Sequence, residues 1–464
     1  MNDWKKKLPL VGSFFLFFSL APFVGSAWWH VEEHDVSRVF QLASIILSIF
    51  FLSNTSAAKD WLITVAVVLV VTFGVIAGRW GSIEAVHLSS LVCLGIVWSR
   101  SLRNRPEHHL LTCLVGLCAA YTFVLLPRWI AFVVEGLPFY AHEFFPAFSN
   151  QRFFGHWVTL SLPLVVLARE RWSGAPTLAR WLDLLAALWV AFAVASGTRG
   201  TWMALTLITL LLPLAGFAGR RLARGMVRAA LLGVGAYALM FWLIPLLVSG
   251  QSSPAGLSRL IEGGSLSLRD VIWSEAWRGI LAHPLMGLGP MMLAATSNGV
   301  AAHPHSFFLQ IASEWGVPVA LGVVGVFARA GWIQLQLCRR DGDPLRTAVL
   351  AAIGAGLLHA QVDGVLVMPF GQTLFVLLCA WIASMSATEV STVPHSTVGR
   401  YGFRLRGLLL VLVFAQVWLI WPELTRLKEW EQETHAAGGG GLYLPRYWTQ
   451  GTIPLEPQPL FRPL

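Results

Sequence analysis

The chain has 464 residues, of which 56% are hydrophobic and 12% are charged, and its mean hydropathy is +0.65. Soluble domains carry about 25% charged residues, so this composition excludes an ordinary water-soluble protein. The apolar runs are continuous rather than alternating, which favours membrane-spanning helices over a β-barrel. We therefore expect an all-α, polytopic integral membrane bundle.

The net charge of +9 does not indicate a nucleic-acid partner, because the basic residues lie in short loops between apolar runs, where they act as topology signals. The five cysteines are odd in number, form no CxxC pair and fall in or beside apolar runs. This pattern argues against a disulfide framework and against a structural zinc site. We expect no metal and no cofactor.

About 20 apolar residues make one helical crossing of a bilayer. By this measure we expect twelve or thirteen transmembrane helices, the first of them an uncleaved helix rather than a signal peptide. The expected spans lie near residues 8–24, 37–53, 61–77, 83–99, 109–127, 153–168, 179–197, 201–218, 226–249, 306–328, 347–366, 370–386 and 405–422.

Lysine and arginine are distributed very unevenly between the two sides of this map. If the N-terminus is cytoplasmic, the loops on that side hold twenty basic residues, and the short loops opposite hold five, namely Arg38, Arg79, Arg128, Arg152 and Arg199. Basic loops stay on the cytoplasmic side, so residues 128–152 and the longest loop, 250–305, are expected outside. The tail after residue 423 lies outside with thirteen spans and inside with twelve.

Arg199 lies in the segment SGTRGTW, in a short turn between two long apolar runs. An arginine at membrane depth is costly unless it is paired, lines a polar cavity or snorkels to the interface. The turn opens a helix, whose free N–H groups and dipole favour an anion. Arg199 is therefore a candidate diphosphate ligand, with an interfacial arginine as the alternative.

The longest loop contains a predicted amphipathic helix that begins after Ser267 and ends near His283. Its apolar face is expected to hold Trp273, Ala276, Trp277, Ile280 and Leu281. Arg269 lies in the first turn, where a cation opposes the helix dipole. An anionic ligand would explain this placement, and a salt bridge to Asp270 or Glu275 is the alternative.

His303 and His305 stand just before the apolar run 306–328, on the expected outer side. Ser306 can cap this helix, whose apolar face is expected to hold Phe307, Phe308, Ile311 and Trp315. Histidine titrates near pH ~6.5 and can take a proton from an attacking hydroxyl. A metal site would need a third ligand, and none lies nearby in sequence. We therefore interpret the two histidines as candidates for proton chemistry.

Together these segments resemble the O-antigen ligase and polymerase superfamily of bacterial envelope glycosyltransferases. The resemblance covers roughly residues 150–385. It depends on the SGTRG turn at 196–200, the R-x-x-x-W…HPLMGLG segment at 269–289 and the H-x-H-S…E-x-G segment at 303–316. Family members commonly have His-Asn where this chain has His305 followed by serine.

The resemblance implies a GT-C-like bundle that transfers a glycan from a polyprenyl diphosphate with inversion and without a metal. It implies a diphosphate-binding role for Arg199 and Arg269, and for Arg152 in QRFFGH. His305 takes the role of the essential histidine, and His303 supports it.

On this reading the chain comprises N-terminal transmembrane helices (1–150), an O-antigen ligase-like core (151–386) that includes the loop 250–305, and a C-terminal helix with its tail (387–464). The expected donor is undecaprenyl-diphosphate-linked O-antigen and the expected acceptor is the lipid A-core oligosaccharide. The site would face the periplasm from the bacterial inner membrane, in contact with membrane lipids. A single long outer loop late in the chain favours a ligase, while an O-antigen polymerase and a protein O-oligosaccharyltransferase stay open.

Two other classes also stay open. A metal-dependent glycosyltransferase would use acids in the first outer loop, where residues 32–35 (Glu-Glu-His-Asp) could hold a hard cation, although a solvated interfacial loop explains them too. A transporter or flippase of lipid-linked glycans would show internal repeats and would need an intramembrane acid such as Asp363. We expect Asp363 to be a polar contact near the outer surface instead.

Overall fold

The structure is a computed structural model that describes residues 31–51, 60–103, 107–137, 139–250, 268–295, 300–387, 402–434, 436 and 446–448. The expected first span, 8–24, and two parts of the long loop, 251–267 and 296–299, lie outside the described residues. Regular structure in the described part is helical, with no strand, which confirms the all-α fold.

The N-terminal helices coincide with the expected spans. They are α2 (Glu33–Phe51), α3 (Asp60–Ile76), α4 (Gly78–Leu102) and α5 (Glu107–Glu135). A single short turn of helix, α6 (Ala141–Phe144), follows them. Gly78 has a φ of +90° and lets the chain turn from α3 straight into α4. Helix α4 packs against α3, α17 and α18, which joins the two ends of the chain.

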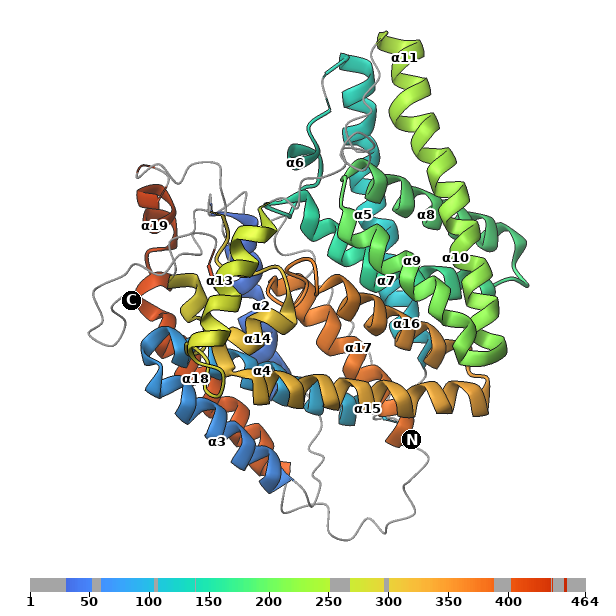
Figure 1. Ribbon diagram of the computed structural model, residues 1–464. Helices are drawn as coiled ribbons and strands as arrows, with labels where there is room; N and C mark the ends of the chain where they lie inside the picture. The colour runs from blue at the N-terminus through green and yellow to red at the C-terminus, as the bar shows by residue number, and fades with distance from the viewer. Residues whose placement is uncertain are drawn as a thin grey trace.

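The next helices are α7 (Gln151–Arg171), α8 (Pro176–Ala195), α9 (Arg199–Leu211), the 3₁₀ turn η1 (Leu212–Ala215), α10 (Gly216–Tyr237), the π-helical η2 (Ala238–Leu243) and α11 (Ile244–Ser249). From α9 to α11 the helical path is continuous over 51 residues and covers two expected spans. Gly216, with a φ of +83°, marks the bend between them. Figure 1 shows α11 and α5 rising beyond the other helices.

The long loop contributes α13 (Arg269–Ala282) and η3 (Met292–Ala295), and α14 (Phe307–Trp315) follows it. The C-terminal third holds α15 (Val317–Asp341), α16 (Pro344–His359), α17 (Pro369–Ala387), α18 (Gly402–Leu424) and α19 (Leu427–Thr434). In Figure 1, α13 and α14 lie over one end of the helix bundle.

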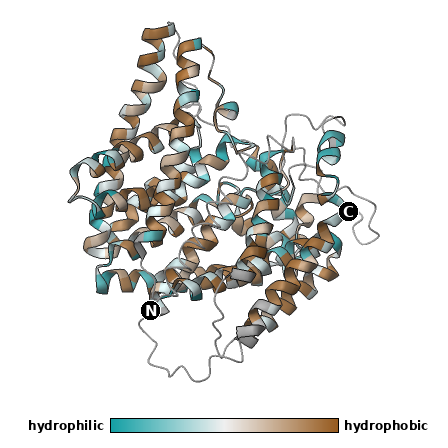
Figure 2. Ribbon diagram, turned by 180° about the vertical axis from the view of Figure 1, so that it is seen from behind, coloured by the Kyte–Doolittle hydropathy of each residue, from teal (hydrophilic) through white to brown (hydrophobic). Residues whose placement is uncertain are grey.

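Membrane insertion is supported by seven described helical stretches that are long and apolar enough to cross a bilayer. They are Gly78–Leu102, His109–Glu135, Pro176–Ala195, Arg199–Ser249, Val317–Asp341, Pro369–Ser386 and Gly407–Leu424, and two shorter apolar helices accompany them. Large apolar side chains point outward, for example Leu247 at 75% exposure and Trp418 at 81%. Figure 2 shows apolar residues along most helices and hydrophilic residues gathered on α19. The chain is therefore a multi-pass membrane protein.

Helix α7 forms the centre of the bundle. It is buried along most of its length and packs against α5, α8, α16 and α17. Its aromatic side chains stack closely: the Phe154 and Phe145 rings lie 4.6 Å apart, and Trp157 meets Trp189 edge to face at 5.1 Å. This packing brings the N-terminal end of α7 beside the C-terminal end of α16.

Two expectations about local structure were wrong in whole or in part. The run 306–328 is not one helix, because Gly316 adopts φ +90° and ψ 158° between α14 and α15, and the crossing helix is α15. The apolar face expected on α14 is confirmed: Trp315 is buried, and Phe307, Phe308 and Ile311 are half-buried and packed against the apolar core. On α13 the buried residues are Ile272, Ala276, Gly279 and Ile280, while Trp277 and Leu281 are exposed.

The acidic segment 32–35 is not the solvated interfacial loop that the sequence analysis considered. Helix α2 begins at Glu33, and the side chains of His34 and Asp35 are buried in the bundle.

Candidate active site

The turn before α9 brings three helices into close contact. Gly197 has a φ of +64°, and α9 begins at Arg199, as expected. A Cβ atom on Gly200 would lie 2.6 Å from Nε2 of His359, and one on Gly155 would lie 2.5 Å from Oγ1 of Thr201. Glycine at these two positions is what allows α9 to approach α16 and α7. The Arg199 side chain itself is exposed.

Arg269 connects the loop helix α13 to the segment after α16. Its Nε and one terminal nitrogen donate to the carbonyl of Val362, at 3.1 and 2.8 Å. Burial lowers the pKa of Arg269, the Asp363 carboxylate opposes this shift, and the charges of Arg152 and Arg199 reinforce it. Arg269 therefore lies within electrostatic reach of two other arginines, Arg152 and Arg199, and of one carboxylate, Asp363.

The turn from His303 to His305 is held from several sides. The indole of Trp273 donates to the Pro304 carbonyl at 2.8 Å, and the N–H of Phe307 donates to the Ala360 carbonyl at 2.8 Å. The N–H of His305 donates to Nδ1 of His303 at 3.2 Å, and the two rings are 4.2 Å apart. Ser306 caps α14 by accepting from the N–H of Leu309 at 3.4 Å, as expected.

His305 has a φ of +49°, in the left-handed region that few side chains occupy. Such a conformation costs of order 1–3 kcal/mol and persists only where the surroundings enforce it. The contacts of the turn supply that enforcement, and they aim the imidazole at one carboxylate. Nδ1 of His305 lies 3.5 Å from Oδ1 of Asp363.

Asp363 is 4% exposed and receives the Gly364 N–H at 2.8 Å. Burial alone would raise the pKa of Asp363, but His156 and His305 hold it well below its usual value. Burial lowers the pKa of His305, and Asp363 acts in the opposite direction. At neutral pH the pair is thus an ionised carboxylate beside a neutral imidazole.

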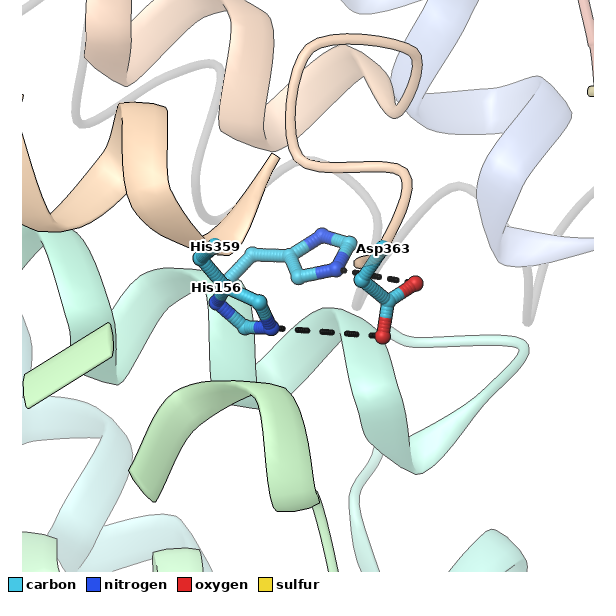
Figure 3. Close-up of side chains that lie close together, drawn as sticks. All are labelled: His156, His359 and Asp363. Carbon is cyan, nitrogen blue, oxygen red and sulfur yellow. Dashed lines mark ion pairs between the residues drawn. The ribbon is translucent and has the colours of Figure 1, made fainter. Parts of the chain in front are cut away.

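Two further histidines meet the same carboxylate, and sequence reasoning missed this arrangement. Nε2 of His156 lies 3.6 Å from Oδ1 of Asp363, and Nε2 of His359 lies 3.9 Å from Oδ2 (Figure 3). On its other side, Nδ1 of His359 is 2.8 Å from the Thr159 hydroxyl. Both histidines are buried. One nitrogen of each and one oxygen of Asp363 lie within 4.8 Å of one another, close enough to bind a metal ion together.

This donor set fits a metal in type as well as in spacing. Two imidazoles and one carboxylate are the protein ligands of many catalytic zinc sites, and ligands at ~2.1 Å from a tetrahedral ion lie roughly 3.4 Å apart. The same contacts also suit a metal-free network in which Asp363 orients three imidazoles.

An apolar cavity of about 930 Å³ opens beside the histidine turn, between α4, α14, α15 and α17. Phe307 and Gln310 line it at the end near His305. Arg100 and Arg103, at the C-terminal end of α4, line it at the other. The cavity is large enough for a ligand of drug size or more, and its walls suit an extended apolar chain.

The family model described as O-antigen ligase matches residues 184–324 of this chain. The matched segment runs from α8 into α15 and contains Arg199, Arg269, His303 and His305. The comparison with curated proteins found no match.

Proposed function

We propose that this chain, which belongs to the O-antigen ligase and polymerase superfamily, transfers O-antigen polysaccharide from undecaprenyl diphosphate to the lipid A-core oligosaccharide. The observation that carries the proposal is the arrangement around Asp363, where a neutral His305 lies 3.5 Å from an ionised carboxylate. His305 is within electrostatic reach of Arg152 and Arg269, and Arg269 is in turn within reach of Arg199. A base beside a cationic anion-binding surface is what glycosyl transfer from a diphosphate requires.

In the proposed reaction, Arg199, Arg269 and Arg152 bind the diphosphate and neutralise the charge that grows on it as it leaves. Nδ1 of His305 faces Asp363, so Nε2 is the nitrogen left to accept a proton. It takes that proton from the acceptor sugar hydroxyl as the hydroxyl oxygen attacks the anomeric carbon. The bond from that carbon to the diphosphate breaks on the opposite face, and the configuration inverts.

Asp363 would act on His305 as a carboxylate acts on the histidine of a catalytic triad. It holds one tautomer and stabilises the imidazolium that forms when the proton arrives. His303 would position the turn, since its Nδ1 accepts the His305 backbone N–H.

The cavity beside α14 gives the polyprenyl chain a place to bind. Its walls are apolar, and its near end lies at Phe307, two residues after His305. We propose that the donor enters sideways between α4 and α15 and that the site faces the periplasm of the inner membrane, in line with the charge bias of the loops.

A metal-assisted transfer is the second candidate, and the cluster of His156, His359 and Asp363 favours it. A bound divalent ion could polarise a phosphate oxygen or the acceptor hydroxyl. We favour the metal-free mechanism, because Asp363 then serves His305 and the arginines supply the charge.

The test is a transfer assay with purified protein, undecaprenyl-diphosphate glycan and lipid A-core acceptor. We expect a ligated product, its loss by 10²-fold or more in His305→Ala, and a partial loss in His303→Ala. Donor binding should persist in His305→Ala, because the arginines hold the diphosphate. Joining of donor glycans to each other would favour the polymerase, and an indispensable His303 with a replaceable His305 would mean that the wrong base was chosen.

The same assay separates the two mechanisms. We expect turnover to survive excess EDTA. Loss of turnover with EDTA, restored by Mn²⁺ or Zn²⁺ in the parent and not in His156→Ala, would establish the metal-assisted mechanism.

A further inference from the structure

The segment Arg446–Trp448, distant in sequence from the other site residues, is buried in the core beside the histidine turn. Arg38 Nε of α2 donates to the Tyr447 carbonyl at 3.1 Å, and Gln416 of α18 donates to the Tyr447 hydroxyl at 2.7 Å. Nothing in the local sequence predicts this burial. Burying an arginine costs free energy unless its charge is paired and its N–H groups are hydrogen-bonded.

The guanidinium of Arg446 has three acceptors from three separate parts of the chain. One terminal nitrogen donates to the Ala302 carbonyl at 3.2 Å, across 144 positions of sequence. The other donates to Oε1 of Glu84 at 3.0 Å and to Oε2 of Glu314 at 2.5 Å. Arg446 is 3% exposed and Glu314 is fully buried, so this is an ion pair inside the protein.

Glu314 links Arg446 to the long loop through a hydrogen bond. Its Oε1 accepts the N–H of Leu293 in η3 at 3.0 Å. Burial raises the pKa of Glu314 to about 7, and Arg446 opposes that shift. Two buried carboxylates beside one cation are a costly arrangement for stability alone, since apolar side chains often serve a buried site as well or better.

The carbonyl bound by Arg446 belongs to the residue immediately before the histidine turn. Arg446 therefore holds the turn at Ala302, while Trp273 of α13 holds it at Pro304. His305, with its positive φ, lies just after these two anchors. If one anchor is removed, the imidazole can drift from Asp363, and a displacement near 1 Å can cost a reaction ~10²-fold.

We propose that Arg446 is a positioning residue for the transfer reaction: it binds the Ala302 carbonyl while paired with two carboxylates and so fixes the turn that presents His305. This inference rests on the proposed function, because it assigns Arg446 to the site that His305 serves. The competing role is stabilisation of the fold alone.

The decisive variant is the double substitution Arg446→Gln with Glu314→Gln. It leaves the charge balance of the buried cluster as it is in the parent when both carboxylates are ionised, yet it removes the guanidinium from Ala302. Arg446→Lys, which keeps a cation beside both carboxylates, is the second variant. The matched control is Arg426→Gln, since Arg426 also contacts two carboxylates, Glu429 and Glu433, but on the exposed surface.

Three quantities are measured for each variant: the unfolding temperature, the separate kcat and KM for the donor, and hydrogen exchange of the amides in residues 300–306. For the double variant we expect a folded protein whose unfolding temperature is lowered, because the buried Glu84 loses its pairing with Arg446. Measured well below that temperature, kcat should fall about tenfold or more, and KM should change less than twofold, because the arginines that bind diphosphate are untouched. Exchange in residues 300–306 should quicken. Arg446→Lys should lose kcat several-fold, and Arg426→Gln should match the parent.

A folded double variant with parental kcat and parental exchange would overturn the proposal. The proposal would also be overturned if Arg446→Lys lost kcat only at temperatures where it begins to unfold, or if the double variant changed KM and not kcat. If the parent itself transfers no glycan, the proposed function fails, and the exchange of residues 300–306 then decides alone whether Arg446 fixes the turn.

Discussion

Replacing Asp363 by asparagine tests the link between carboxylate and base most directly. The amide keeps the size of the side chain and an oxygen to accept the Gly364 N–H, but it removes the negative charge 3.5 Å from Nδ1 of His305. The contact can become a charge-assisted hydrogen bond when His305 takes up the proton, an interaction of about 1.5–3 kcal/mol, and each 1.36 kcal/mol is tenfold in rate. We therefore expect Asp363→Asn to lower kcat by roughly 10- to 150-fold.

The pH dependence of this variant gives the reasoning a second check. Asp363 raises the pKa of His305 against the effect of burial, so its neutralisation should lower that pKa further. Because His305 must be neutral to act, the acid limb of kcat/KM should move to lower pH. The assay is initial-rate transfer from pH 5 to 8, with Asp343→Asn as control. Asp343 caps the opposite end of α16, where asparagine serves equally well. Parental kcat with an unmoved acid limb would refute the role of Asp363.

Two other predictions concern the site, and a third concerns the topology. In the parent, burial lowers the pKa of His305, so kcat/KM should fall as pH drops with a midpoint below ~6.5; a midpoint above that value would contradict a buried base. Arg199→Lys and Arg269→Lys keep the charge but lose the planar fork. Each should reach the membrane at normal levels and lose at least ~10-fold activity, and parental ligation by both would make these arginines structural. In a cysteine-free background, an impermeant maleimide applied from the periplasm should label Arg278→Cys and not Arg340→Cys. The two parent side chains are 74% and 64% exposed, so labelling at 340 would overturn the topology.

The helices were readable from the sequence because lipid exposure demands long apolar runs, and these runs were visible without any knowledge of packing. The break at Gly316 was missed, although a glycine followed by Pro318 marks the end of one helix and the start of the next. An apolar run crossing both positions outweighed that signal. The buried face of α13 was assigned wrongly in part because aromatic residues at helical spacing also occur on exposed faces.

Single residues of the candidate site could be predicted from the sequence, but their convergence on Asp363 could not. Arg199, Arg269 and His305 stood out because charged or titratable residues at the ends of apolar runs need a reason. His156 and His359 lie in α7 and at the end of α16, and their convergence on Asp363 is set by the packing of two helices, which no spacing in the chain reveals. One signal was available: His359 and Asp363 are only four residues apart, and Arg152 and His156 have the same spacing, which places that pair on one face of α7.

The position of Arg446 has a consequence for how the protein matures. Ribosomal synthesis runs from the N-terminus, so α4 and the histidine turn emerge long before residue 446 does. Until then Glu84 and Glu314 have no Arg446 to pair with, and the turn lacks its anchor at Ala302. A chain still on the ribosome would thus contain His305, the proposed base, without the contact that we propose fixes its position. Enzymatic competence would then begin only after residue 446 has been synthesised and inserted, a delay that transfer assays on ribosome-arrested chains of increasing length can time.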